Sequence, residues 1–146
     1  MPKLLRTRPR GFTLLELMVV VAIIALASAG VSLSLRDSTQ SQLEREALRL
    51  SALLEAARAQ SRSSGQVVQW QVKPQGFGFS GLPADSLPTQ WLNADTAVTA
   101  SAALLLGPEP IIGKQSVTLF SRSQPDYVLR VFTDGLRPFA VQPGTA

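Results

Sequence analysis

A run of 24 residues, 12–35, carries a single charged side chain and constrains the fold more than any other part of the chain. A helix over this run is roughly 36 Å long at about 1.5 Å per residue, which exceeds the roughly 30 Å hydrocarbon core of a bilayer. The one charge is Glu16, near the start of the run. The run therefore predicts a membrane-spanning helix, and it leaves the acid to be explained.

Basic residues gather immediately before this run. Lys3, Arg6, Arg8 and Arg10 have no acidic neighbour. They account for the net charge of +4, because the other ten basic residues equal the ten acidic residues in number. Basic flanks of an apolar helix stay on the cytoplasmic side of a membrane. The charge pattern therefore predicts that the chain beyond residue 35 lies across the membrane, and it is weak support for nucleic-acid binding.

Two ordinary interpretations leave part of this pattern unexplained. A secretory signal peptide has a basic start, an apolar stretch of about 7–15 residues and a small-residue cleavage site, which Ala27 could supply. However, the apolar character continues to Leu35, and an acid inside such a stretch is unusual. A simple membrane anchor explains the length, but not why Gly11, Phe12 and Glu16 stand at its cytoplasmic end.

The stretch "RGFTLLELMVVVAIIAL", residues 10–26, resembles the signal of type IV pilins and type II secretion pseudopilins. In that family a short basic leader ends in Gly, the next residue is usually Phe, and a Glu follows four residues later. The resemblance implies that a prepilin peptidase cuts between Gly11 and Phe12 and that Phe12 becomes the N-methylated terminus. It also implies that Glu16 guides assembly by pairing with the positively charged N-terminus of an adjoining subunit or with its own.

The next segment predicts a helix with one apolar face. Apolar residues recur at spacings of four, three, four and three residues, at Leu43, Ala47, Leu50, Leu54 and Ala57. We expect Leu43, Leu50 and Leu54 to be core residues. The charged residues of the segment are expected on a solvated face, with contact to neighbouring subunits as the alternative; they are Arg45, Glu46, Arg49, Glu55, Arg58 and Arg62. The stretch "SRSSG", residues 61–65, predicts the end of the helix.

Alternation with a period of two begins after this helix and predicts strands. In "VVQWQVK" the residues Val68, Trp70 and Val72 share one face, so Trp70 is expected in the core. "GFGFSG" continues a hairpin, residues 82–97 form a loop, and further strands are expected at 98–106, 116–122, 127–132 and 139–141. Turns at "SQPD" and "TDG" connect them into an antiparallel meander. Asp126 and Asp134 are expected to be turn formers rather than calcium ligands.

The expected fold is therefore α+β and pilin-like. A long N-terminal helix, membrane-spanning in its first half and amphipathic in its second, packs on an antiparallel β-sheet head. The expected divisions are a leader peptide at 1–11, a transmembrane and assembly helix at 12–35, an amphipathic helix at 36–64 and a periplasmic head at 65–146.

The head resembles the H-type minor pseudopilins, a group that also includes FimT-like minor pilins, in "LEREALRLSALLEAARAQSRSSGQVV" and "VFTDGLRPFAV". The resemblance implies a structural subunit near the tip of the periplasmic pseudopilus of a type II secretion system, anchored in the inner membrane. Its implied partners are the prepilin peptidase, other major and minor pseudopilins, the inner-membrane assembly platform and, as a further option, a secreted substrate. The alternative is a minor type IV pilin in pilus assembly, adhesion or DNA uptake.

A membrane-anchored enzyme or binding module is the third hypothesis. The chain has no His and no Cys, and its sequence has no nucleophile–base pair, phosphate-binding glycine loop or ligands at metal-binding spacing. We therefore expect no catalytic residue, cofactor or metal. After Arg62 the five basic residues are matched by five acidic ones, which favours a protein partner over nucleic acid.

Overall fold

The computed structural model describes residues 12–99 and 103–144, apart from the side chains of residues 32–37. The chain forms two compact units, Met1–Arg36 and Asp37–Ala146. Predictions that concern residues 1–11, including Gly11, lie outside the described residues.

Helix α1, Leu14–Ser64, contributes to both units and is capped at each end. At its start the carbonyl oxygen of Thr13 accepts the N–H of Leu17 at 3.2 Å, and Thr13 Oγ1 accepts the N–H of Glu16 at 3.3 Å. A threonine at this position satisfies a backbone donor that has no partner within the helix. At the other end Gly65 has a φ of 67°, a left-handed conformation that glycine adopts readily and that terminates many helices. The helix therefore ends within the predicted stretch.

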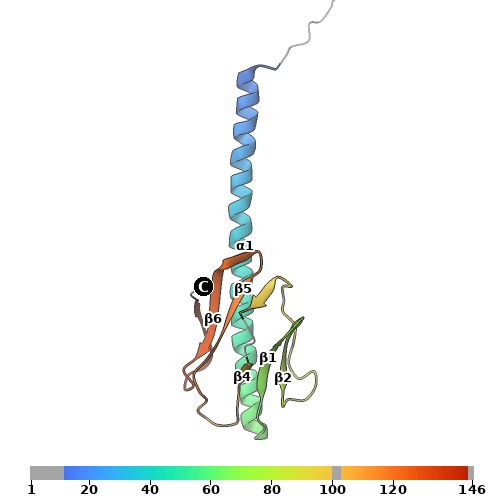
Figure 1. The fold of residues 1–146 in the computed structure, drawn as a ribbon, viewed down its shortest axis with the longest axis vertical. Coiled ribbons are helices and arrows are strands. Elements are labelled where there is room, and N and C mark those ends of the chain that lie inside the picture. Colours follow the sequence, from blue (N-terminus) through green and yellow to red (C-terminus); the bar gives the residue numbers. More distant parts are fainter. Residues whose placement is uncertain (1–11, 100–102, 145–146) are drawn as a thin grey trace, which may run out of the picture. The chain divides into compact units, whose positions relative to one another are not determined.

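Within its described residues, the second unit contains seven strands in two antiparallel sheets (Figure 1). The strands are β1 (Gln69–Lys73), β2 (Gly76–Ser80), β3 (Thr96–Val98), β4 (Ala103–Leu105), β5 (Gln115–Ser121), β6 (Gln124–Thr133) and β7 (Ala140–Pro143). The order is β2-β1-β4 in the smaller sheet and β3-β5-β6-β7 in the larger one. A long helix followed by antiparallel sheets confirms the predicted α+β, pilin-like fold class.

The core of this unit lies between α1 and both sheets. Leu43, Leu50 and Leu54 of α1 are 2%, 1% and 0% exposed, and Trp70 of β1 is 0% exposed. The same cluster contains residues of both sheets and of the connecting segments: Val68, Phe77, Leu104, Leu106, Val117, Leu119, Leu129, Val131 and Phe139. The apolar stripe of the helix is thus covered on both sides by sheet residues, and burial on this scale is the main stabilising contribution in a small domain.

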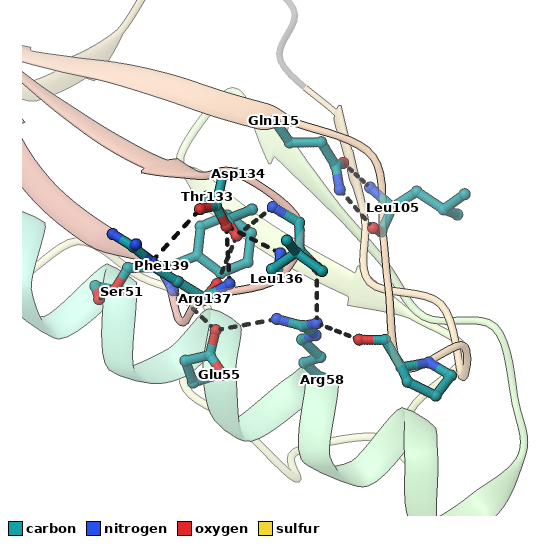
Figure 2. A network of polar contacts seen from close by, with 12 residues as sticks. Ser51, Glu55, Arg58, Leu105, Gln115, Thr133, Asp134, Leu136, Arg137 and Phe139 are labelled. Carbon is teal, nitrogen blue, oxygen red and sulfur yellow. Dashed lines mark hydrogen bonds and ion pairs between the residues drawn. The ribbon is translucent and has the colours of Figure 1, made fainter.

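The expectation of one continuous meander is wrong. Strand β3 (96–98) begins inside the stretch expected as a loop, 82–97, and belongs to the larger sheet. The stretch expected as a single strand, 98–106, contains only the last residue of β3, followed by β4, which belongs to the smaller sheet. The two sheets are nevertheless linked by a side chain. Gln115 at the start of β5 accepts the N–H of Leu105 at 2.6 Å and donates to the carbonyl oxygen of Leu105 at 2.8 Å (Figure 2). Its amide thereby imitates a strand partner for β4.

The turn expected at "SQPD" lies earlier, at Arg122 and Ser123, and Asp126 is in strand β6 rather than in a turn. The physical reason is a bulge: Ser121 pairs with Gln124 and Phe120 with Val128, with a register shift between them. A bulge leaves residues without ladder partners, so it accommodates a proline such as Pro125 within a strand.

Candidate functional site

The N-terminal turn of α1 holds the only acid of the apolar segment. Glu16 is exposed and occupies the third helical position after the capping residue Thr13, in the pattern Thr-x-x-Glu. A carboxylate in the first turn of a helix interacts favourably with the helix dipole. Phe12, just before this turn, is 77% exposed. Phe12 and Glu16 therefore lie at the same end of the helix.

The helix that follows is apolar over a length suited to a membrane. Residues Leu14–Val31 have a mean hydropathy of 2.5, and none of this stretch is buried within the structure. By length and composition it is long and apolar enough to cross a bilayer. Such an exposed apolar surface requires lipid or other apolar helices around it.

A second set of polar groups lies on the head-facing side of α1, and sequence reasoning placed it wrongly. Glu46 was expected on a solvated face, but it is 1% exposed. Its carboxylate accepts the N–H groups of Leu92 and Asn93 at 2.7 and 3.3 Å and pairs with Arg49 at 3.0 Å. Arg49 in turn donates to the carbonyl oxygen of Gln90 at 2.9 Å. This pair fixes the loop before β3 to the helix.

Arg58 is the second buried charge, at 3% exposure (Figure 2). Its Nη2 atom donates to the carbonyl oxygens of Pro110 and Gly135 at 2.8 and 3.3 Å, and Nη1 lies 3.8 Å from a carboxylate oxygen of Glu55. The guanidinium group thus joins two loops that are far apart in the sequence. The expectation of a solvated Arg58 is wrong because these carbonyl groups are drawn into the core and need a donor.

Glu55 and Ser51 hold the segment before β7 in a related way. Glu55 accepts the backbone N–H of Phe139 at 2.9 Å, and the Ser51 hydroxyl donates to the carbonyl oxygen of Phe139 at 2.7 Å (Figure 2). The helix side chains therefore act as the hydrogen-bonding partners of a short extended segment. This arrangement places Phe139 in the core at 4% exposure.

A signal for the buried charges was present in the spacing. Glu46 lies three residues after Leu43 and four before Leu50, and Arg58 lies four residues after Leu54. Residues three or four apart share one face of a helix, so both charges border the apolar stripe. The identity of their partners is not encoded locally, because the carbonyl and amide groups come from loops 40 to 80 residues away along the chain.

Three titratable groups of the head have shifted pKa values. The pKa of Asp95 lies below its usual value, mainly because the Ser121 hydroxyl group donates a hydrogen bond to its carboxylate. A second hydrogen bond, from the Ser123 hydroxyl group, acts in the same direction. The backbone N–H groups of Arg137 and Leu136 lower the pKa of Asp134, which caps the turn after β6. Burial, together with a hydrogen bond to Glu44, raises the pKa of Tyr127.

Asp95, Tyr127 and Asp134 each make hydrogen bonds to other residues of the head. Asp134 is a turn former, as expected. Within residues 12–99 and 103–144, no group of three or more His, Cys, Asp or Glu side chains could hold a metal ion.

Comparison with known proteins adds to the geometry of the N-terminal turn. Residues 6–32 match the family model described as the prokaryotic N-terminal methylation motif. The chain therefore carries this N-terminal methylation motif. The match includes Arg6, Arg8 and Arg10 but not Lys3, and it covers Gly11, Phe12, Glu16 and the whole apolar stretch Leu14–Val31.

Two curated relatives extend beyond this motif. The chain is 32% identical over 83 residues to the type II secretion system protein H of Klebsiella michiganensis, covering 57% of this chain and 45% of the relative. It is 31% identical over 91 residues to the protein of the same name from Aeromonas hydrophila, covering 62% of this chain and 50% of the relative. The chain thus spans about half the length of these relatives. No solved structure gives a significant match. The two relatives carry the same name, and each alignment covers more than half of this chain.

Proposed function

We propose that this protein is a minor pseudopilin, a non-enzymatic subunit of the periplasmic pseudopilus of a type II secretion system. The observation that carries the proposal is the methylation motif at residues 6–32, placed on an exposed apolar helix and followed by a compact α+β head. In this role the helix anchors the subunit in the inner membrane, with its N-terminus in the cytoplasm and its head in the periplasm.

Processing is the first step of the proposed function. A prepilin peptidase cuts between Gly11 and Phe12 and leaves the apolar helix in the mature chain, where Phe12 is N-methylated. The exposed position of Phe12 before the first helical turn supports access to this bond. The mature subunit then enters the pseudopilus near its tip, through the assembly platform and neighbouring pseudopilins.

Glu16 guides this entry in the proposed function. A carboxylate among apolar helices is strongly unfavourable unless it has a partner. The mature N-terminus is a positive charge about 6 Å along the helix from Glu16, by the rise of about 1.5 Å per residue. Pairing with this amine, on an adjoining subunit or its own, makes one axial register more favourable than the others.

Co-purification with the other pseudopilins tests the proposal, with Glu16→Gln as the variant and Glu109→Gln, an exposed loop acid, as the control. We expect Glu16→Gln to be cleaved and inserted normally but to be recovered with the other pseudopilins at a small fraction of the wild-type amount. Glu109→Gln should behave like wild type. Normal recovery and normal secretion with Glu16→Gln would contradict the assembly role. Co-purification with pilus subunits alone would favour the minor type IV pilin.

A further inference from the structure

A groove of about 550 Å³ opens in the head where the two sheets separate. One side is formed by the end of β1 and the β1–β2 turn, residues 72–76, and the other by strand β3, residues 96–98. Gln90, Trp91, Leu92 and Ala94 lie between them, and Arg122 borders the groove from the β5–β6 turn. Nothing in the proposed function uses this groove.

Strand β3 borders the groove with its outer edge, where the N–H of Thr96 already donates to the carbonyl oxygen of Asn93 at 3.1 Å. It is the outermost strand of its sheet and pairs with β5 alone. The carbonyl oxygen of Asp95 accepts the N–H of Arg122, and the N–H of Thr99 donates to Thr118, so residues 95 and 99 point their backbone groups towards β5. Because orientation alternates along an antiparallel strand, the backbone N–H and C=O of Val98 point away from β5. They are positioned to pair with an added strand.

The charge of the groove is positive. Lys73 and Arg122 are the charged residues among those that line it, and no acidic side chain is among them. Arg122 donates through Nη1 to the carbonyl oxygen of Ala94 at 2.9 Å, which fixes the guanidinium group at the groove. A guanidinium group has five N–H donors, so several remain for an anion. One carboxylate oxygen of Asp95 accepts hydrogen bonds from Ser121 and Ser123, and these bonds, with a smaller contribution from the charge of Arg122, lower the pKa of Asp95.

The walls of the groove are held in place by the helix and by β2. Arg49 and Glu46 bind the backbone at Gln90 and Leu92, as described above. The N–H of Phe77 donates to the carbonyl oxygen of Thr89 at 2.8 Å, and the rings of Phe77 and Trp91 are 4.6 Å apart. A site that is formed before binding loses little entropy when a ligand orders in it.

We propose that this groove binds an extended acidic segment of a partner protein, which adds a strand to the outer edge of β3 and places a carboxylate against Arg122. Strand addition of this kind derives affinity from main-chain hydrogen bonds and specificity from flanking side chains. A peptide fits the groove better than single-stranded nucleic acid. Nucleic acid needs a track of cations and exposed aromatic rings, whereas this groove has two cations, and the ring of Trp91 packs against Phe77.

Peptide binding to the full-length protein in detergent micelles tests the proposal, read by fluorescence anisotropy. The probe is a labelled hexapeptide, Val-Glu-Val-Asp-Val-Thr, and the control probe has lysine at both acidic positions. We expect saturable binding of the acidic peptide that weakens with salt, and at least about tenfold weaker binding of the lysine peptide.

Two pairs of variants separate the main-chain contribution from the charge. Val98→Pro removes the N–H that faces the groove and keeps the bonds to β5, since proline is tolerated at such edge positions, whereas Val98→Ala keeps the N–H. Arg122→Gln removes the charge, and Arg130→Gln removes an exposed charge on β6 outside the groove. We expect Val98→Pro and Arg122→Gln each to weaken binding about tenfold relative to their controls. Arg122→Lys, which keeps the charge, should bind more tightly than Arg122→Gln.

The proposal is overturned by any of four results. These are no saturable binding of the acidic peptide, equal binding of the lysine peptide, no difference between the two Val98 variants, and binding of a short oligothymidine at Arg122 in place of the peptide. Far-UV circular dichroism of each variant should match that of wild type, so that a loss of binding is assigned to the groove. Pseudopilus entry tested through Glu16 concerns the other unit, so each proposal can fail without the other.

Discussion

At the scale of single residues, two buried charged side chains of α1, Glu46 and Arg58, form hydrogen bonds with backbone groups that have no strand partner. Glu46 receives two N–H groups from a loop without regular structure, and Arg58 supplies donors to two carbonyl groups. Buried backbone groups that lack partners are strongly unfavourable. A helix side chain that is long enough to reach these backbone groups therefore stabilises loops that are not part of either sheet.

Glu46→Ala should be strongly destabilising. It leaves the N–H groups of Leu92 and Asn93 and the guanidinium group of Arg49 without their acceptor, and the loss of one partner from a buried, charged hydrogen-bond network amounts to about 3 kcal/mol. Urea unfolding followed by tryptophan fluorescence measures the change, because both tryptophans lie in the head. Asp126→Ala, an exposed acid on β6, should change the free energy of unfolding by less than about 0.5 kcal/mol. Equal effects of the two substitutions would contradict the role given to Glu46.

The lowered pKa of Asp95 leads us to expect that the stability of the head depends on pH. Its pKa is lower in the folded protein than in the unfolded chain, so its ionised form stabilises the fold. This contribution is fully present above the unfolded value of about 3.9 and is lost as the pH falls through the lower folded value.

The free energy of unfolding of wild type should therefore decrease below about pH 4, and Asp95→Asn should show a smaller decrease over the same range. Unfolding curves between neutral pH and about pH 3 measure the difference. Parallel curves for the two proteins would show that the Ser121 and Ser123 bonds do not stabilise the ionised form.

At the scale of elements, the helix was the part most open to prediction. The apolar stripe at Leu43, Leu50 and Leu54 follows from a helical periodicity that can be read directly from the sequence. The stretch "SRSSG" marks the end of the helix. The β1–β2 hairpin was also predictable, because its two strands are adjacent in the sequence and pair directly, with Trp70 opposite Phe79. The placement of β3 (96–98) and β4 (103–105) in different sheets was not predictable, because it depends on which strand each of them pairs with.

Gly65 shows how a single residue ends the helix. Its φ of 67° is strained for residues with a Cβ atom, and no atom lies within 4 Å of the position where a Cβ would be. Gly65→Ala should therefore destabilise the head by about 1 kcal/mol through backbone conformation alone. Gly65→Asn should have a smaller effect, since asparagine tolerates this conformation.

Thermal unfolding of the head measures both substitutions. Gly113→Ala is the control, because Gly113 also has open space around it but no positive φ. We expect the control to leave the unfolding temperature unchanged or slightly raised. A similar loss with Gly113→Ala would assign the effect to loop glycines in general rather than to the helix end.

At the scale of the whole molecule, the chain combines an apolar helix that needs external apolar partners with a head that has its own core. The first feature and its acid at Glu16 were readable from composition and spacing. The groove beside β3 could not be predicted from the sequence. It arises where two sheets separate, whereas the sequence pattern predicted a single sheet. Arg122 and Val98 line the same groove because β3 pairs with β5, and this pairing joins residues more than twenty positions apart in the sequence.

The central claim is that the apolar helix begins a mature, methylated subunit rather than a signal peptide. Intact-mass measurement of the protein expressed with a prepilin peptidase tests it most directly. The account predicts a chain that starts at Phe12 and carries one added methyl group, and an unprocessed precursor when Gly11 is replaced by a bulky residue. A chain that starts near Ala29 or Gly30, with the apolar helix removed, would contradict it.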